Sequence, residues 1–130
     1  MSEFNFKSQV CTSCLQSERL LALDLKKETA DCYWFYCNIA KEWKCTILSS
    51  TQVFEDYPTT VIPAWSLHRL VSLTNTDDIK IACNEKSCWC GNVLKIAQRK
   101  AFIKDNLYDN IIDCIEWLIK EGYFNKEYLV

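Results

Sequence analysis

The cysteines are the residues whose number and spacing most directly suggest chemistry. The chain has nine of them in 130 residues, at positions 11, 14, 32, 37, 45, 83, 88, 90 and 114. Cys11 and Cys14 have the two-residue gap of a zinc knuckle, and side chains two residues apart in a strand point to one face. One hypothesis is therefore a zinc-stabilised binding module with these ligands: Cys11, Cys14, Cys88 and Cys90.

Other interpretations of the cysteines stay open from the sequence. The second pair begins 74 residues after Cys14 and is spaced Cys-x-Cys, whereas a zinc ribbon normally repeats Cys-x-x-Cys. A redox pair at Cys11 and Cys14 would need a βαβ context, which is missing here. An odd number of cysteines in a chain long enough to bury a core disfavours a disulfide scaffold. Unpaired cysteine is usually a small buried hydrophobe, the interpretation that we favour for Cys32, Cys37, Cys45 and Cys114.

The chain offers little else for catalysis or cofactor binding. His68 is the single histidine and is predicted at the border of an apolar helix face, where a satisfied structural histidine is expected. Gly91 and Gly122 are the two glycines, and their isolation excludes the glycine-rich loops that bind nucleotide phosphates. We therefore predict that the protein is not an enzyme and has no cofactor, with zinc as the exception under the alternative hypothesis.

A basic run raises a second alternative, weak binding of single-stranded nucleic acid. Lys95, Arg99 and Lys100 would form a stacking platform if they lay beside the aromatic segment 33–36. Against this, the formal net charge is −2 and the pI is about 5.4, far below the values typical of nucleic-acid-binding domains. We do not expect nucleic acid to be the main partner.

Composition places the chain among ordinary globular domains. It is 49% hydrophobic and 25% charged, which predicts one domain over residues 1–130. No run approaches the roughly 20 apolar residues of a membrane-spanning helix, and residues 1–10 lack the apolar core of a signal peptide. We expect a cytoplasmic protein without membrane contact.

The hydrophobic pattern predicts an α+β domain, with an antiparallel sheet of four to five strands packed against about three helices. Helices are predicted at 14–24, where Ser13 and Gln16 form a capping box, at 64–73 after Pro63, and from Asn106 to Gly122. Strands are predicted at 32–37, 43–48, 79–83, 88–96 and 100–104, the first two forming a hairpin.

Two tryptophans are left over once the apolar faces of these helices are assigned. Trp65 and Arg69 are predicted on the side of their helix opposite its apolar stripe, and Trp117 stands among the polar residues of the last helix. Exposed tryptophans are common anchors of protein interfaces, so these three residues are our candidate interaction site.

Several segments carry a resemblance to a known group of proteins. They are Val10-Cys11-Thr12 leading into Gln16-Ser17-Glu18-Arg19-Leu20, Lys27-Glu28-Thr29-Ala30-Asp31, Ile62-Pro63-Ala64-Trp65-Ser66-Leu67, and Leu107-Tyr108-Asp109 through Trp117-Leu118-Ile119. The chain resembles small α+β proteins encoded by prophages and mobile elements of gut anaerobic bacteria. This resemblance implies the fold class, but brings no established activity, cofactor or catalytic residues.

The leading hypothesis from the sequence is therefore a non-enzymatic accessory protein of a mobile element. It would act through contacts with an unidentified protein partner or with a second copy of itself. The zinc module and the weak single-strand binder remain as alternatives.

Overall fold

The structure is a computed structural model that describes residues 9–84 and 86–130. Its α+β class is as predicted, but the strands form two antiparallel sheets of three strands each instead of one larger sheet, with four α-helices among the described residues. The elements are α1 (Cys14–Ala22), β1 (Cys32–Cys37), β2 (Glu42–Ile47), α2 (Gln52–Asp56), β3 (Val61–Ala64), α3 (Leu67–Thr74), β4 (Ile79–Cys83), β5 (Ser87–Asn92), β6 (Arg99–Ile103) and α4 (Leu107–Lys120).

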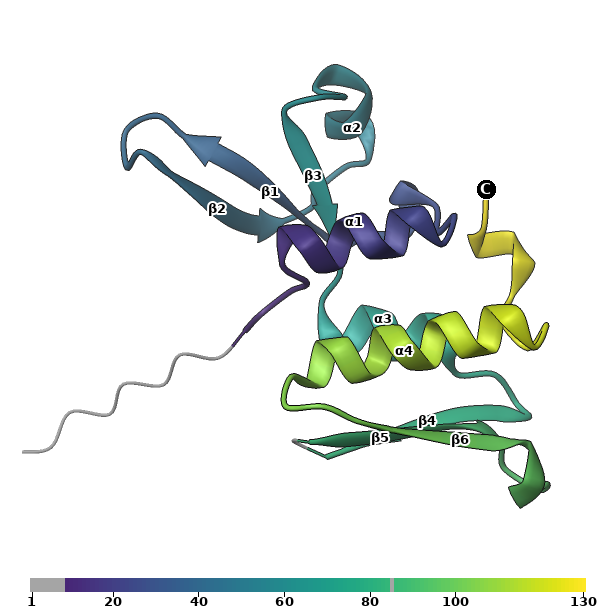
Figure 1. The fold of residues 1–130 in the computed structure, drawn as a ribbon. Helices are drawn as coiled ribbons and strands as arrows, with labels where there is room; N and C mark the ends of the chain where they lie inside the picture. Colours follow the sequence, from purple (N-terminus) through teal and green to yellow (C-terminus); the bar gives the residue numbers. More distant parts are fainter. Residues whose placement is uncertain (1–8, 85) are drawn as a thin grey trace, which may run out of the picture.

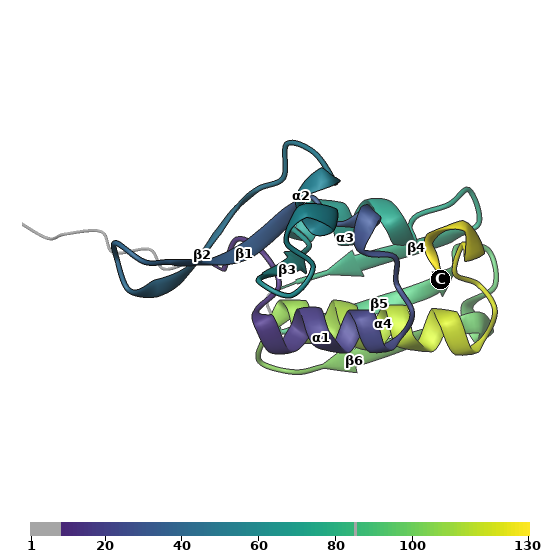
Figure 2. The same ribbon diagram turned by 90° about the horizontal axis from the view of Figure 1, so that it is seen from above.

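The first sheet has the strand order β2-β1-β3. The predicted hairpin is confirmed as β1 and β2, in a register that places Cys32 opposite Ile47 and Cys37 opposite Glu42. β3 pairs with the other side of β1 but reaches only as far as Phe35. The outer part of the hairpin therefore extends away from the rest of the molecule (Figures 1 and 2). We call residues 32–47 the arm.

The second sheet has the order β4-β5-β6 and carries the helices on one face. α4 packs on β5 and β6, α3 packs on β4, and α1 lies over α4 and contacts β3 (Figure 1). Alternation along β5 buries Cys88 and Cys90 under α4 and leaves Trp89 on the opposite face, where no helix or strand of residues 9–84 and 86–130 packs (Figure 1).

Most of the large core lies between these layers. Leu20 of α1, Trp65 after β3, and Ile111, Ile115 and Leu118 of α4 are all fully buried in one cluster. A smaller cluster at the base of the arm contains Cys11, Cys32 and Ala64. An ion pair on the flank of the large core joins Arg19 to Asp113 and Glu116, at 2.5 and 2.8 Å.

Local signals place α1 and α4 where the sequence predicts them. Ser13 and Gln16 form the capping box of α1. The Asn106 side chain accepts the Asp109 N–H at the start of α4, and Gly122 follows its end with φ of 78°. None of the helices in residues 9–84 and 86–130 combines the length and apolar character needed to cross a bilayer.

The predicted helix at 64–73 begins later than expected. Pro63 belongs to β3, opposite Tyr33, and α3 begins at Leu67 with Ser66 as its N-cap. Asp31 holds this start in place by accepting hydrogen bonds from the Ser66 N–H and hydroxyl. The prediction that Trp65 projects from the polar side of a helix is therefore wrong, because Trp65 precedes the helix and is fully buried.

Candidate interaction surface

The arm presents one edge of its sheet without a neighbouring strand. The Leu48 N–H donates to the Asp31 carbonyl at 2.8 Å, which sets the alternation of hydrogen bonds between β1 and β2. In that alternation the amides and carbonyls of Lys44 and Thr46 face β1, whereas those of Trp43, Cys45 and Ile47 face away from it. No described residue forms a backbone hydrogen bond to these three outward positions. We call Trp43, Cys45 and Ile47 the arm edge.

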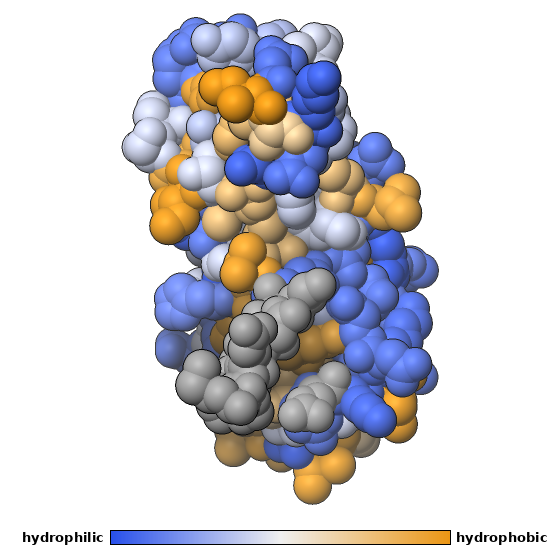
Figure 3. Space-filling model, turned by 90° about the vertical axis from the view of Figure 1, so that its left-hand side faces the viewer, coloured by the Kyte–Doolittle hydropathy of each residue, from blue (hydrophilic) through white to orange (hydrophobic). Residues whose placement is uncertain are grey.

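Exposed apolar side chains accompany this edge. Trp43 is 45% exposed and Ile47 is 81% exposed, and period-two alternation places both on the same face of β2. Directly opposite Trp43 on β1 is Tyr36, whose ring meets the indole edge-on at 5.9 Å between centroids. Ile39, at the tip of the arm, is 97% exposed. Figure 3, which looks onto this side of the molecule, shows orange hydrophobic side chains on its upper part, next to blue hydrophilic ones.

The base of the arm is tied to the segment before α1. The Trp34 indole N–H donates to the Thr12 carbonyl at 2.8 Å, and the Trp65 N–H donates to the Thr12 hydroxyl at 3.1 Å. A backbone bond from the Thr12 N–H to the Trp65 carbonyl completes the connection at 2.9 Å. These bonds tie the root of the arm to the segment before α1.

The small cysteine cluster lies in the same place. Cys45 packs against Cys11 and Cys32 from β2. Burial, followed by the neighbouring Cys45 thiol, raises the pKa of Cys11. Burial, followed by the Asp31 carboxylate, raises the pKa of Cys32 to about 12. Both thiols are therefore neutral at physiological pH, and they pack as small apolar groups.

The four cysteines of the zinc hypothesis do not converge. Cys11 belongs to the cluster at the base of the arm, whereas Cys88 and Cys90 are buried in the large core between β5 and α4, and Cys14 is half-buried at the start of α1. Within residues 9–84 and 86–130, no group of three or more histidine, cysteine or acidic side chains is placed to hold a metal ion. The prediction that Cys11, Cys14, Cys88 and Cys90 bind one zinc ion is therefore wrong, because the fold places the first pair and the second pair in different layers.

The three residues of the candidate interaction site, Trp65, Arg69 and Trp117, lie in three different environments. Trp65 is a core residue whose indole N–H donates to the Thr29 hydroxyl at 2.9 Å. Arg69 is exposed on α3 and lines an open hollow at the base of the arm together with Cys45 and Ile47. Trp117 is half-buried on α4, where its ring packs on Tyr123 at 5.9 Å between centroids. Trp65 therefore does not project into solvent and Trp117 is partly exposed. The role of Arg69 and Trp117 in binding stays a prediction.

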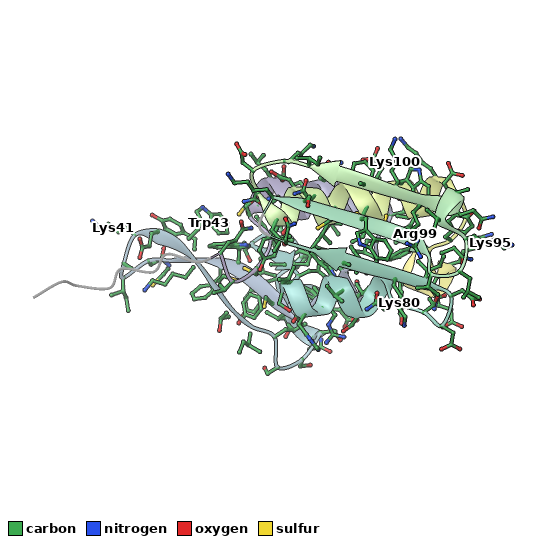
Figure 4. All side chains as sticks on the ribbon, turned by 90° about the horizontal axis from the view of Figure 1, so that it is seen from below. Lys41, Trp43, Lys80, Lys95, Arg99 and Lys100 are labelled. Atoms are coloured by element: carbon green, nitrogen blue, oxygen red, sulfur yellow. The ribbon has the colours of Figure 1, made fainter. Side chains whose placement is uncertain are left out.

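The basic residues do not join the aromatic strand. Lys95, Arg99 and Lys100 lie at the far end of the molecule from Lys41 and Trp43 (Figure 4). Register places Lys100 on the α4 face of β6 and Arg99 on the opposite face. The Arg99 guanidinium lies 4.7 Å above the Trp89 ring and donates to the carbonyls of Asn92 and Val93, so it is engaged within the fold. The single platform that the basic run suggested is therefore not assembled.

His68, the single histidine, is exposed on α3, and its ring forms no hydrogen bond with the described residues. The arm edge, in contrast, was missed as a site by reasoning from sequence. The signal for it was the alternation of Trp43, Cys45 and Ile47 with Glu42, Lys44 and Thr46, which is typical of a strand with one apolar face. The strand order that leaves this face at a free edge is set by distant residues.

Comparison with known proteins adds no relative. No protein-family model matches the chain, and no significant match is found among the curated proteins or the solved structures. The function must therefore be argued from the arm and its surroundings.

Proposed function

We propose that this protein is a non-enzymatic interaction module that associates with a second copy of itself through the arm edge. The observation that carries the proposal is the row of outward amides and carbonyls at Trp43, Cys45 and Ile47, flanked by exposed apolar side chains. An uncovered edge strand is a template for adding another strand. A role as an accessory protein of a mobile element, implied by the resemblance, stays part of the proposal.

A twofold antiparallel pairing centred on Cys45 uses all three outward positions. Trp43 of one copy then lies opposite Ile47 of the second copy, and Cys45 lies opposite its own equivalent. Each of these pairs exchanges two backbone hydrogen bonds, and the two exposed apolar residues cover each other.

Two other symmetric registers are less favourable. Centring the pairing on Lys44 places two like charges directly opposite each other, which destabilises a sheet. Centring it on Trp43 pairs Glu42 with Lys44 of the second copy, but the strand cannot continue in that direction because Lys41 has a φ of 56° and turns the chain. The Cys45-centred register is thus the one that we propose.

The shape of the molecule supports a second copy as the occupant. The arm extends beyond the end of β3 and away from the helices, which leaves the outer part of β2 accessible to a second strand (Figures 1 and 2). The result would be a six-stranded sheet, β3-β1-β2 continued by the same strands of the second copy.

Sedimentation equilibrium of the wild-type chain and two matched variants tests this proposal. Ile47→Lys puts a charge opposite the Trp43 indole of the second copy and should raise the dissociation constant by about tenfold or more. Ile103→Lys is the control, because Ile103 is 80% exposed on β6, another edge strand, against 81% for Ile47. A wild-type protein that stays monomeric from micromolar to millimolar concentration contradicts the proposal, and so does an equal effect of the two substitutions.

A further inference from the structure

A second feature, independent of the arm, involves two cysteines at the end of the other sheet. Cys83 of β4 and Cys88 of β5 are direct partners in the register. One position nearer the turn, the Asn84 N–H donates to the Ser87 carbonyl at 2.9 Å. Hydrogen-bonded and non-hydrogen-bonded pairs alternate in an antiparallel ladder, so Cys83 and Cys88 form a non-hydrogen-bonded pair. Cα atoms in such pairs are about 4.5 Å apart, within the range that a disulfide can bridge.

The two thiols differ in their access to solvent. All nine cysteines lie within the described residues, and Cys83 is the one that is exposed. Cys88 is 1% exposed and lies beside Cys83 on the same face of the sheet, where α4 covers it. A small reagent can therefore reach Cys83 directly, whereas Cys88 is shielded from solvent.

The two thiols also differ in pKa. The neighbouring Cys88 thiol favours the thiolate form of Cys83 and so lowers the pKa of Cys83. The interaction with Cys83, followed by burial, raises the pKa of Cys88. An accessible thiol with a lowered pKa beside a second thiol is the arrangement found at redox-active cysteine pairs. Cys11 and Cys32 at the base of the arm, by contrast, are buried and have raised pKa values.

We propose that Cys83 and Cys88 form a reversible cross-strand disulfide, with Cys83 as the attacking thiol and Cys88 as the resolving thiol. The oxidant is a low-molecular-weight disulfide of the glutathione type. The Cys83 thiolate attacks one sulfur of that disulfide, its S–S bond breaks, and one small thiolate leaves and takes up a proton. Cys88 then loses its proton and attacks the Cys83 sulfur, which expels the second small thiol. Two protein thiols are oxidised and one small disulfide is reduced to two thiols.

The test is equilibration of the reduced full-length protein with graded mixtures of reduced and oxidised glutathione, followed by alkylation and peptide mass spectrometry. Trypsin cleaves after Lys86, so a Cys83–Cys88 bond joins peptide 81–86 to peptide 87–95. The linked peptides should appear as the mixture becomes oxidising and disappear when it is made reducing. Fragmentation of peptide 87–95 distinguishes Cys88 from Cys90 as the linked residue.

Three variants separate the roles of the thiols. Cys83→Ser, at an exposed position that should not affect folding, should abolish the linked peptides. Cys88→Ser should instead accumulate a mixed disulfide with glutathione at Cys83, since the resolving step is lost. Cys90→Ser is the matched control, a buried thiol of the same strand whose loss should leave the linkage intact. A wild-type protein in which Cys83 stays reduced under oxidising conditions, or in which fragmentation shows Cys83 linked to Cys90 instead of Cys88, would overturn the proposal.

Discussion

The Trp34 indole on the arm and the Thr12 carbonyl before α1 are joined by a 2.8 Å hydrogen bond, so the strand that carries the arm is anchored to the body at its root. Thr12 is fully buried, and its hydroxyl also accepts the Trp65 N–H and pairs with the Ser17 hydroxyl at 2.7 Å. One residue thus links three segments that are far apart in the chain. This connection is what allows a thin hairpin to present a free edge in a defined direction.

Replacing Thr12 tests the link between its side chain and the Trp65 backbone. Thr12→Val keeps the shape of the side chain but removes the hydroxyl, leaving the buried Trp65 N–H without its side-chain acceptor. We expect a loss of about 1 to 3 kcal/mol in the free energy of unfolding, measured by urea denaturation. Thr60→Val, at an exposed position, should change it by less than about 0.5 kcal/mol. Equal effects at the two positions would show that the Thr12 hydroxyl does not stabilise the link to Trp65.

The two glycines should respond very differently to substitution. Gly91 has a φ of 137°, and a Cβ there would lie 2.2 Å from the Gln98 carbonyl oxygen, so Gly91→Ala forces β5 and the start of β6 apart. Gly122 has a φ of 78° but open space around it, so Gly122→Ala should cost only about 1 kcal/mol. Urea denaturation should rank Gly91→Ala as much the more destabilising. The reverse order would contradict the close approach of these strands.

The ion pair between α1 and α4 predicts a pH dependence of stability. Hydrogen bonds from Arg19 and Lys120 lower the pKa of Glu116 below its ordinary value of 4.5. A carboxyl group with a depressed folded-state pKa stabilises the protein above its unfolded-state pKa, and this contribution is lost as pH falls through the folded-state value. The wild-type denaturation midpoint should therefore fall below about pH 4.5 more steeply than that of Glu116→Gln. Glu121→Gln, at an exposed position, should retain the wild-type slope.

Substitution of Trp65 and of Trp43 should have different effects on stability and on self-association. Trp65→Ala removes a fully buried ring and should cost about 3 to 5 kcal/mol in the free energy of unfolding. Trp43→Ala removes a ring that is 45% exposed, so it should cost much less stability but weaken self-association. Denaturation and sedimentation of the same two variants provide the comparison. A Trp43→Ala protein that associates like the wild type would exclude Trp43 from the interface.

The elements predicted well from the sequence are those whose signals are local. Asn106, Asp109 and Gly122 mark the ends of α4 within its own sequence, and Ser13 with Gln16 does the same for α1. Pro63 is different, because proline is acceptable both in the first turn of a helix and at some strand positions. Its missing N–H falls opposite Tyr33 at a non-hydrogen-bonded position of β3, and that depends on pairing with β1.

The arm edge was less predictable from the sequence, because it depends on pairing between distant segments. The alternation along β2 indicated an apolar face, but the free edge follows from the strand order β2-β1-β3. Trp65 was misplaced because Thr12, distant in sequence, takes up its backbone groups before the chain turns into α3. The cysteine spacing similarly gave no hint that Cys11 would meet Cys45.

The central claim, association through the arm edge, is tested most directly by amide hydrogen exchange at each residue of β2, measured by NMR at several protein concentrations. The Lys44 and Thr46 amides face β1 and should be protected to the same degree throughout. The Trp43, Cys45 and Ile47 amides face outward, and their protection should rise with concentration as the second copy binds. Outward amides that exchange at the same rate at every concentration would contradict the account.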